Sequence, residues 1–246
     1  MRLLIIDIET LPITARTWGL WNQNIGINQI VDPGGVLCFA AQFAGERKMH
    51  FASLWDDGDR GMTRKAHSLL DEADAVLGWN SDKFDIRWLN SQFLKHGMAL
   101  PSPFVKVDLM KSVKRQVYLP SYKLDFVARF LGVGSKIRTG GFDLWADVIS
   151  GDESARNKMR RYNIGDTRLT GAVFEKLREK GWVRGLPNHA LEHGHACPHC
   201  GSERLQARGY ASSKTRRYKR FQCRDCHGWS QAVVSEPGSA SLKAVA

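Results

Sequence analysis

The sequence predicts an α/β protein in which a mixed sheet is flanked by helices and a small zinc-binding module lies at the carboxyl end. β-branched apolar segments dominate the first third of the chain, and amphipathic helical segments dominate the next part, which is the order expected when helices pack on a sheet. Four of the five cysteines form two Cys-x-x-Cys pairs near the carboxyl end, a pattern typical of metal binding. The length of 246 residues accommodates one ordinary domain and one small module.

The expected sheet begins with residues 3–8, a nearly continuous apolar run typical of a strand covered on both faces. Residues 36–43 and 48–54 are two further expected strands, separated by glycine-containing turns. Three strands in succession predict an antiparallel meander.

The rest of this domain alternates between helix and strand. Gly132 and Gly181 are expected to end the helices that precede them. Gly165 lowers helix stability by about 1 kcal/mol without forbidding a helix, so the last two helices are expected either separately or as one. The expected helices are 64–74, 83–96, 124–131, 153–163 and 166–180, with a strand at 75–79.

A segment without periodicity marks the expected domain boundary. Residues 184–194 contain Gly, Pro and His and are expected to form a linker. We therefore expect a main domain at 1–183, a small zinc module at 195–234 and a flexible tail at 235–246.

The composition favours a nucleic-acid partner. Lys and Arg outnumber Asp and Glu by 36 to 25, which gives a formal charge of +11 and favours a polyanion. No run approaches the roughly 18 to 20 apolar residues that a membrane span needs, so no membrane partner is expected. Paired cysteines suit a reducing compartment, and we expect a cytoplasmic protein.

Two carboxylates lie close together on the first expected strand. Asp7 and Glu9 are two residues apart and project from one face, while Ile6 and Ile8 project from the other. Because two carboxylates near an apolar sheet repel each other unless cations neutralise them, the pair is a candidate divalent-metal site. Taken alone, the same pattern is equally typical of a solvated strand end.

Two more acidic positions accompany helices. Asp85 lies where a strand leads into a helix, and Asp82 is the better candidate for capping that helix. Tyr162 and Asp166 are four residues apart and share one helix face, which places a phenol beside a carboxylate. A surface hydrogen bond is the alternative interpretation of this last pair.

Taken together, these motifs resemble a known family. DIET at 7–10, NSDKFD at 80–85 and YNIGD at 162–166 occur in the order and approximate spacing of the tyrosine branch of the DEDD exonuclease superfamily, which has a ribonuclease-H-like fold. The segment SYKLDFVA at 121–128 is similar to a helix in the proofreading domains of family B DNA polymerases. The resemblance covers about residues 2–180.

The resemblance implies a catalytic apparatus. Asp7, Glu9, Asp85 and Asp166 would hold two Mg²⁺ or Mn²⁺ ions around the scissile phosphate, with Asp7 bridging both. Tyr162 would orient or help deprotonate the attacking water, and nucleoside 5′-monophosphates would leave from a 3′ end. The terminal nucleotide would contact Thr10, Leu11, Asn80 and Phe84, although Phe84 is equally well explained as a core residue of its helix.

The cysteine pairs predict a second metal site. Two Cys-x-x-Cys knuckles can direct four thiolates to one structural zinc, with His199 or His227 as substitute ligands. The segment between the pairs carries cations interleaved with aromatic side chains, a mixture that can follow a phosphate backbone and stack bases. The expected zinc ligands are Cys197, Cys200, Cys223 and Cys226, and the expected nucleic-acid contacts are Lys214, Arg216, Arg217, Tyr218, Lys219, Arg220 and Phe221.

The expected function is hydrolysis of single-stranded DNA or frayed 3′ ends by a two-metal mechanism, with the zinc ribbon aiding binding. A 3′→5′ exoribonuclease is the first alternative, and a nucleic-acid-binding or interaction module is the second. A polymerase or another replication or recombination protein is the kind of protein partner such an enzyme would have. The long segment 11–31, rich in Trp, Asn, Gln and Ile, is expected to form either a flap over the site or a satellite cluster.

Overall fold

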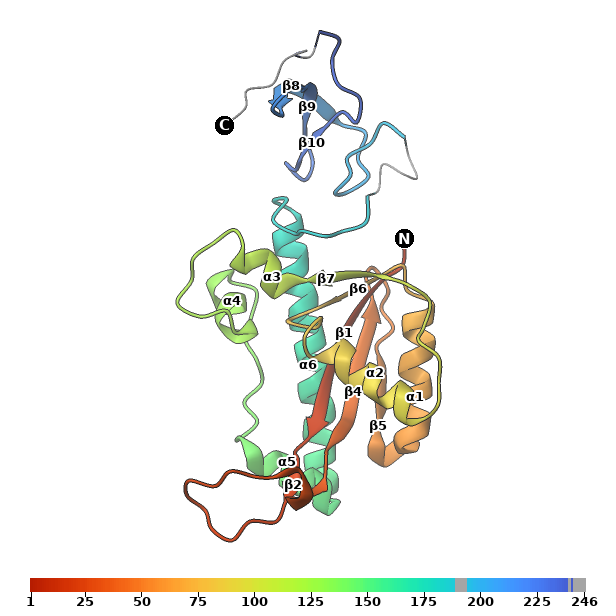
Figure 1. Cartoon of the computed structure of the whole chain (residues 1–246), viewed down its shortest axis with the longest axis vertical. Helices are drawn as coiled ribbons and strands as arrows, with labels where there is room; N and C mark the ends of the chain where they lie inside the picture. Colours follow the sequence, from red (N-terminus) through yellow and green to blue (C-terminus); the bar gives the residue numbers. More distant parts are fainter. Residues whose placement is uncertain (189–193, 239, 241–246) are drawn as a thin grey trace.

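The computed structural model describes residues 1–188, 194–238 and 240, in two parts (Figure 1). A five-stranded sheet with the strand order β5-β4-β1-β6-β7 forms the centre of the larger part. Strands β5, β4 and β1 are antiparallel neighbours, whereas β1, β6 and β7 are parallel. The strands are β1 Leu3–Leu11, β4 Gly35–Phe43, β5 His50–Ser53, β6 Ala75–Gly78 and β7 Val105–Asp108. The expected meander is thereby confirmed.

Helices cover both faces of this sheet. Leu4, Ile6 and Ile8 pack against one group of helices, and the alternating residues Leu3 and Ile5 pack against the other. The helices of the first face are α1 Leu54–Asp71 and α2 Asp85–Lys95. Those of the second are α3 Leu109–Lys114, α4 Leu124–Phe130, α5 Phe142–Ser150 and α6 Glu153–Arg178. The strand alternation therefore directs Asp7 and Glu9 toward the face that α6 covers.

Helix α6 is continuous through Gly165, so the last two expected helices are one. A Cβ atom on Gly165 would lie 3.1 Å from Cδ1 of Ile137, and one on Gly171 would lie 3.3 Å from Cδ1 of Ile5. The two glycines therefore allow a neighbouring loop and strand β1 to approach α6 closely. Gly181, with φ +69°, lies just after the helix end, as expected.

Three expectations about the secondary structure need correction. Helix α1 begins earlier than predicted: Ser53 caps a short first segment by accepting a hydrogen bond from the Asp56 amide at 3.2 Å, and Gly58, with a φ of 68°, forms a kink between this segment and the rest of the helix. Asp82 does not cap α2; its carboxylate instead pairs with Lys111. The short elements β7, α3 and α5 were not predicted, since four to nine residues carry too little periodicity.

The segment between β1 and β4 contains β2 Thr14–Ala15, the short 3₁₀ helix η1 Ile27–Gln29 and β3 Ile30–Asp32. β2 and β3 pair with each other in a separate small sheet. Figure 1 shows the segment between them extending away from the body of the domain. It neither covers the sheet as a flap nor forms a buried satellite cluster, because most of its large apolar side chains are exposed.

The carboxyl-terminal part is a small antiparallel sheet beside four cysteines. Its strands are β8 Leu205–Ser212, β9 Arg217–Cys223 and β10 Trp229–Gln231, in the order β10-β9-β8. It lies beyond the end of α6 in Figure 1, where a Cβ on Gly181 would be 3.1 Å from Cα of Gly228. Residues 189–193 of the expected linker, and most of the expected tail (239 and 241–246), fall outside the described residues.

Within the described residues, no helix combines the length and the apolar character needed to cross a membrane.

Candidate nuclease site and four-cysteine site

Three carboxylates meet between β1 and α6. Asp7 and Glu9 contribute from β1 and Asp166 from α6, and one carboxylate oxygen of each lies within 4.8 Å of the other two. Asp7 faces Ala40 of β4, a small residue that leaves room over this part of the sheet. The cluster therefore results from two local periodicities, the two-residue repeat of a strand and the turn of a helix.

Asp85 occupies the first turn of α2 and is buried. Its Oδ1 accepts a hydrogen bond from the Ile8 amide at 3.0 Å, so it reaches β1 between Asp7 and Glu9. It is not one of the three mutually close carboxylates, but it is near enough to raise the pKa of Asp7 by charge repulsion.

The carboxylates are strongly perturbed because they are buried together. Burial, and then repulsion from the neighbouring acids, raises the pKa of Asp7 well above its usual value. Burial likewise raises the pKa of Glu9 to about 8 and that of Asp85 to about 6, and it raises the pKa of Asp166. Negative charge at this site is therefore costly unless a cation balances it.

Lys136 supplies one such cation and was not anticipated from the sequence. Its Nζ lies 2.7 Å from Oδ2 of Asp166 and donates a hydrogen bond to the Tyr162 hydroxyl at 3.0 Å. Its backbone amide is held by Asp125 at 2.7 Å, within the segment 121–128. No sequence signal links a loop lysine to acids that are 30 and more residues away.

Asn163 is the second unanticipated residue. It is completely buried beside the acids, and its Nδ2 donates to Oδ2 of Asp7 at 2.7 Å and to the Asp7 carbonyl at 3.1 Å. It lies within the motif 162–166 but was not singled out, because amide residues in helices are common. Asn163 fixes the orientation of the Asp7 carboxylate.

The donor set fits hard divalent cations. Carboxylate oxygens are the ligands that Mg²⁺ and Mn²⁺ prefer, and three are gathered here. Oδ1 of Asp166 is buried and has no hydrogen-bond partner among the described residues, which leaves it available as a ligand. Asp7, Glu9 and Asp166 could hold an ion directly, and Asp85 is close enough to add charge.

A cleft of about 560 Å³ opens beside Asp7. Asn80 and Lys136 line it, together with residues of the segment 121–128. Asn80 has a positive φ of 63° and its amide donates to Oδ1 of Asp108 at 3.2 Å, so a buried acid fixes this turn. The cleft therefore opens the acidic cluster to solvent on the side of Asp7.

The other residues expected to contact the substrate are Thr10, Leu11 and Phe84. Thr10 and Leu11 come after a bulge in β1 that follows Glu9, and both are half-buried. Phe84 is 40% exposed and contacts Trp88 edge-to-face, so the interpretation of Phe84 as a core residue was wrong. Its ring faces solvent at the start of α2.

The raised pKa values of these acids lead to a testable prediction about metal binding. In the folded protein the pKa values of Glu9 and Asp85 lie above the usual values near 4. At a pH between the usual and the raised value, each of these groups therefore holds more of its proton in the folded protein than in the unfolded chain. In chelator, the free energy of unfolding is therefore expected to fall as pH rises from about 4 to about 8. Added Mg²⁺ should raise Tm more at pH 8 than at pH 5, as thermal melts can measure. Equal Mg²⁺ effects at both pH values would contradict the assignment.

The four cysteines form a compact cluster, in which all four Sγ atoms lie within 4.8 Å of one another. Sγ of Cys197 is 3.6 Å from that of Cys226, and Sγ of Cys200 is 3.7 Å from that of Cys223. Four thiolates about 2.3 Å from one zinc ion would be roughly 3.8 Å apart, so the spacing fits zinc. His199 contacts the Trp229 carbonyl at 3.2 Å instead of joining the cluster.

The cations of the ribbon are distributed over both faces of its sheet. Arg217 stacks on Tyr210 and Arg220 on Trp229, each within 4.6 Å of the ring centroid. Phe221 is half-buried against His195, and Tyr218 is also half-buried. The exposed members of the expected contact set are Lys214, Arg216, Arg217, Lys219 and Arg220.

Comparison with known proteins agrees with this architecture. Residues 4–178 match the family profile of the RNase H superfamily. A search of curated proteins found no match. Among solved structures, the family B DNA polymerase from the archaeon Pyrobaculum calidifontis is similar, with a TM-score of 0.57 and 21% sequence identity. The match covers 74% of this chain but only 25% of the polymerase. The chain belongs to the RNase H superfamily.

Proposed function

We propose that the chain is a metal-dependent 3′→5′ exonuclease of the tyrosine branch of the DEDD superfamily. It hydrolyses single-stranded DNA or frayed 3′ ends and releases nucleoside 5′-monophosphates. One observation carries the proposal: α6 presents Tyr162 and Asp166, one turn apart, to the two carboxylates of β1. An acidic cluster with an adjacent phenol suits phosphodiester hydrolysis better than binding alone.

The acids and their neighbours have distinct tasks in this mechanism. Asp7, Glu9, Asp85 and Asp166 would hold two Mg²⁺ or Mn²⁺ ions, which supply a hydroxide nucleophile and stabilise the charge on the leaving oxygen. Asn163 keeps the Asp7 carboxylate oriented through its hydrogen bond at 2.7 Å.

Tyr162 orients the attacking water. Without metal, burial and the nearby charges of Asp166 and Glu9 raise the pKa of the phenol above its usual value. Lys136 donates a hydrogen bond to the hydroxyl at 3.0 Å and holds it in place, which suits a positioning role for Tyr162.

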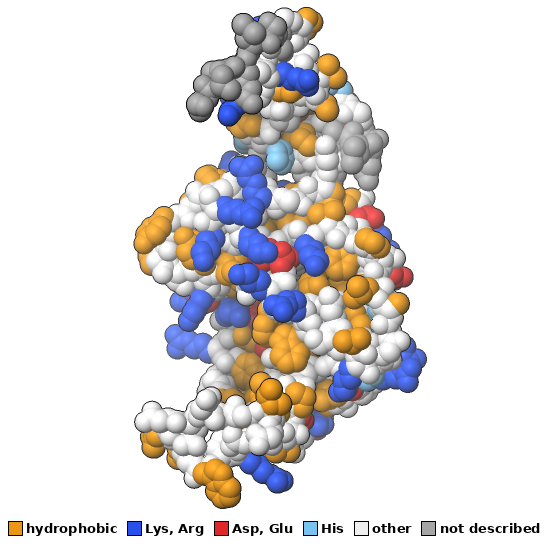
Figure 2. All heavy atoms as spheres, in the orientation of Figure 1, with side chains coloured by type: hydrophobic (Ala, Val, Ile, Leu, Met, Phe, Trp, Pro, Cys, Tyr) orange, Lys and Arg blue, Asp and Glu red, His pale blue; other side chains and the backbone are white. Residues whose placement is uncertain are grey.

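A basic surface leads to the cleft. Figure 2 shows Lys and Arg side chains gathered over the region of α3, β7 and the start of α2. These exposed cations can follow a phosphate backbone toward the acids. The exposed Lys and Arg residues in and beside these elements are Lys83, Arg87, Lys106, Lys114 and Arg115, and exposed Lys123 lines the cleft itself.

The proposal extends to the whole chain. Residues 1–183 act as the nuclease domain, and the ribbon at 195–234, folded around one structural zinc, helps to bind nucleic acid. Four cysteines that bind zinc as thiolates suit a reducing compartment such as the cytoplasm.

Digestion of matched 5′-labelled strands tests the proposal. DNA and RNA, single-stranded and duplex, are incubated with the full chain in Mg²⁺ or Mn²⁺, with and without chelator, and resolved as ladders. We expect a ladder that shortens from the 3′ end of single-stranded DNA and is abolished by chelator. A ladder from RNA alone would identify an exoribonuclease. The absence of any cleavage would reject a nuclease.

The ribbon gives a separate prediction about salt. Changing Lys214, Arg216, Arg217, Lys219 and Arg220 together to Gln should weaken binding to long single strands. Each phosphate that is no longer neutralised flattens the plot of log affinity against log salt by about 0.7, so three to five such phosphates flatten it by roughly 2 to 3.5.

The matched comparison is a chain truncated after Leu186, which retains the packing of Leu186 on the larger domain. Truncation also removes stacking by Tyr218, worth roughly 1 to 3 kcal/mol per base and insensitive to salt. If the charge-neutralised chain kept both affinity and salt slope, the ribbon would be a docking site for a protein.

A further inference from the structure

The segment 12–34 between β1 and β4, here called the indole loop, has a defined base. Thr14 pairs with Asp32 and Ala15 with Ile30. The Arg16 amide donates to the Gln29 carbonyl at 2.9 Å, and Gln29 Nε2 donates back to the Arg16 carbonyl at 2.9 Å. The base of the loop therefore holds its outer part in a fixed direction.

The outer part exposes an unusual amount of apolar surface. Trp18 is 100% exposed, and Trp21, Ile27 and Leu20 are 83%, 88% and 89% exposed. Exposed apolar surface gathered in one place marks a binding site more often than chance. None of these side chains belongs to a core cluster of the described residues, so their apolar surface is open to contact with another molecule.

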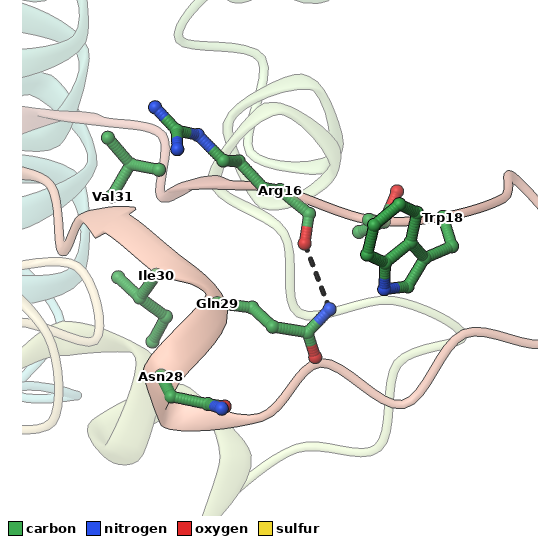
Figure 3. A pocket seen from close by; sticks show the side chains of 7 residues that line it. Arg16, Trp18, Asn28, Gln29, Ile30 and Val31 are labelled. Carbon is green, nitrogen blue, oxygen red and sulfur yellow. Dashed lines mark hydrogen bonds between the residues drawn. The ribbon is translucent and has the colours of Figure 1, made fainter.

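The surface beside Trp18 contains a hollow that is lined by both apolar and polar side chains. A hollow of about 600 Å³ is lined by Arg16, Trp18, Asn28 and the apolar side chains of β3 (Figure 3). The Arg16 guanidinium and the Asn28 amide form no hydrogen bond or ion pair within the described part of the chain. A purely apolar partner would leave both groups unpaired, which is costly. A nucleotide offers a base for the indole, base edges for the amide and a phosphate for the guanidinium.

The loop lies at the end of the strand that carries the acids. Between Glu9 and Thr14 the extended chain spans at most about 17 Å. The loop returns at Gly35, which pairs with Leu11. A single strand whose 3′ end occupies the acidic cluster can therefore reach the base of the loop within a few nucleotides, and Trp18 follows Thr14 by four residues.

We propose that the indole loop binds bases of the single strand that leads into the acidic cluster, by stacking on Trp18 and Trp21. The inference rests on the proposed nuclease function and adds a substrate-binding site to it. Arg16 is the only Lys or Arg between residues 12 and 34, so binding there depends on stacking rather than on charge. This contrasts with the ribbon, where cations predominate.

Substrates of two sizes test the loop. The nitrophenyl ester of thymidine 5′-monophosphate has no flanking nucleotides, whereas an oligothymidylate a dozen nucleotides long can reach the loop. We expect Trp18→Ala with Trp21→Ala to raise the Kd for the oligonucleotide roughly 5- to 100-fold for each base that no longer stacks. Hydrolysis of the nitrophenyl ester should be unchanged. The ratio of affinities should stay constant as salt is raised, because stacking releases no counterions.

Tyr118→Ala is the matched control, since Tyr118 is 94% exposed but lies outside the loop. The Tyr118→Ala variant should bind the oligonucleotide with the same affinity as the wild type. In chelator, the oligonucleotide should quench tryptophan fluorescence of the wild type more than that of the double variant, which tests binding without hydrolysis.

The outcomes separate this inference from the proposed function. If the double variant binds the oligonucleotide as tightly as the wild type, the loop does not bind nucleic acid, while a wild-type ladder would still support the nuclease. If the wild type hydrolyses neither substrate but the quenching difference persists, the nuclease proposal fails and the loop remains a binding site.

Discussion

Asp7→Ala is expected to abolish hydrolysis while leaving the fold intact. Asp7 belongs to the cluster of three carboxylates and is the ligand proposed to bridge both ions. Loss of metal-derived charge stabilisation worth several kcal/mol corresponds to a rate lower by roughly 10³-fold or more. Single-turnover hydrolysis of labelled single-stranded DNA measures the effect.

The same variant should be at least as stable as the wild type in chelator. Removing one of several mutually repelling carboxylates relieves the repulsion that raises the pKa of Asp7. Asn163 keeps a hydrogen bond to the residue 7 carbonyl at 3.1 Å, so its amide is not left unpaired. Asp143→Ala, at an exposed position on α5, is the control and should retain full activity. Substantial cleavage by pure Asp7→Ala protein would rule out a two-metal site.

Tyr162→Phe is expected to slow the chemical step by about 10² to 10⁴ without weakening metal or DNA binding. Only the hydroxyl is removed, and the ring keeps its edge-to-face contact with Trp145 at 6.2 Å. Lys136 loses one acceptor but keeps its ion pair with Asp166. Single-turnover rates, with Mg²⁺ and DNA affinities measured in parallel, separate chemistry from binding.

Tyr118→Phe removes a hydroxyl from an exposed ring and serves as the control. It should leave the rate unchanged. A Tyr162→Phe rate equal to that of the wild type would assign this tyrosine a structural role only, with the hydroxyl serving to hold Lys136.

The sequence predicts those parts of the site that depend on local periodicity. Asp7 and Glu9 share a strand face, and Tyr162 and Asp166 share a helix face, so each pair can be predicted from spacing alone. The four cysteines are similarly constrained by their knuckles. The covering of β1 on both faces follows from its nearly continuous apolar run.

The parts that depend on tertiary contacts were not predictable in this way. Lys136 reaches Asp166 from a loop whose position is fixed by its amide contact with Asp125. Asp82 pairs with Lys111 of another helix rather than capping its own. Phe84 has a helical spacing that suggested burial, yet its ring lies outside the core because the helix begins only at Asp85.

Gly165 and Gly171 affect how closely helix α6 approaches its neighbours beside the acidic cluster. Each replaces a methyl group at a point of close approach, Gly171 against Ile5 of β1 and Gly165 against Ile137 beside Lys136. Together they cost the helix about 2 kcal/mol relative to alanine. A methyl group at either contact would displace a neighbour by a few tenths of an ångström, because such contacts are tighter than ordinary van der Waals separation. Gly171 thus lets α6 lie close against Ile5, on the same face of β1 that carries Asp7 and Glu9, so a side chain missing from the helix helps to bring Asp166 near the acids of the strand.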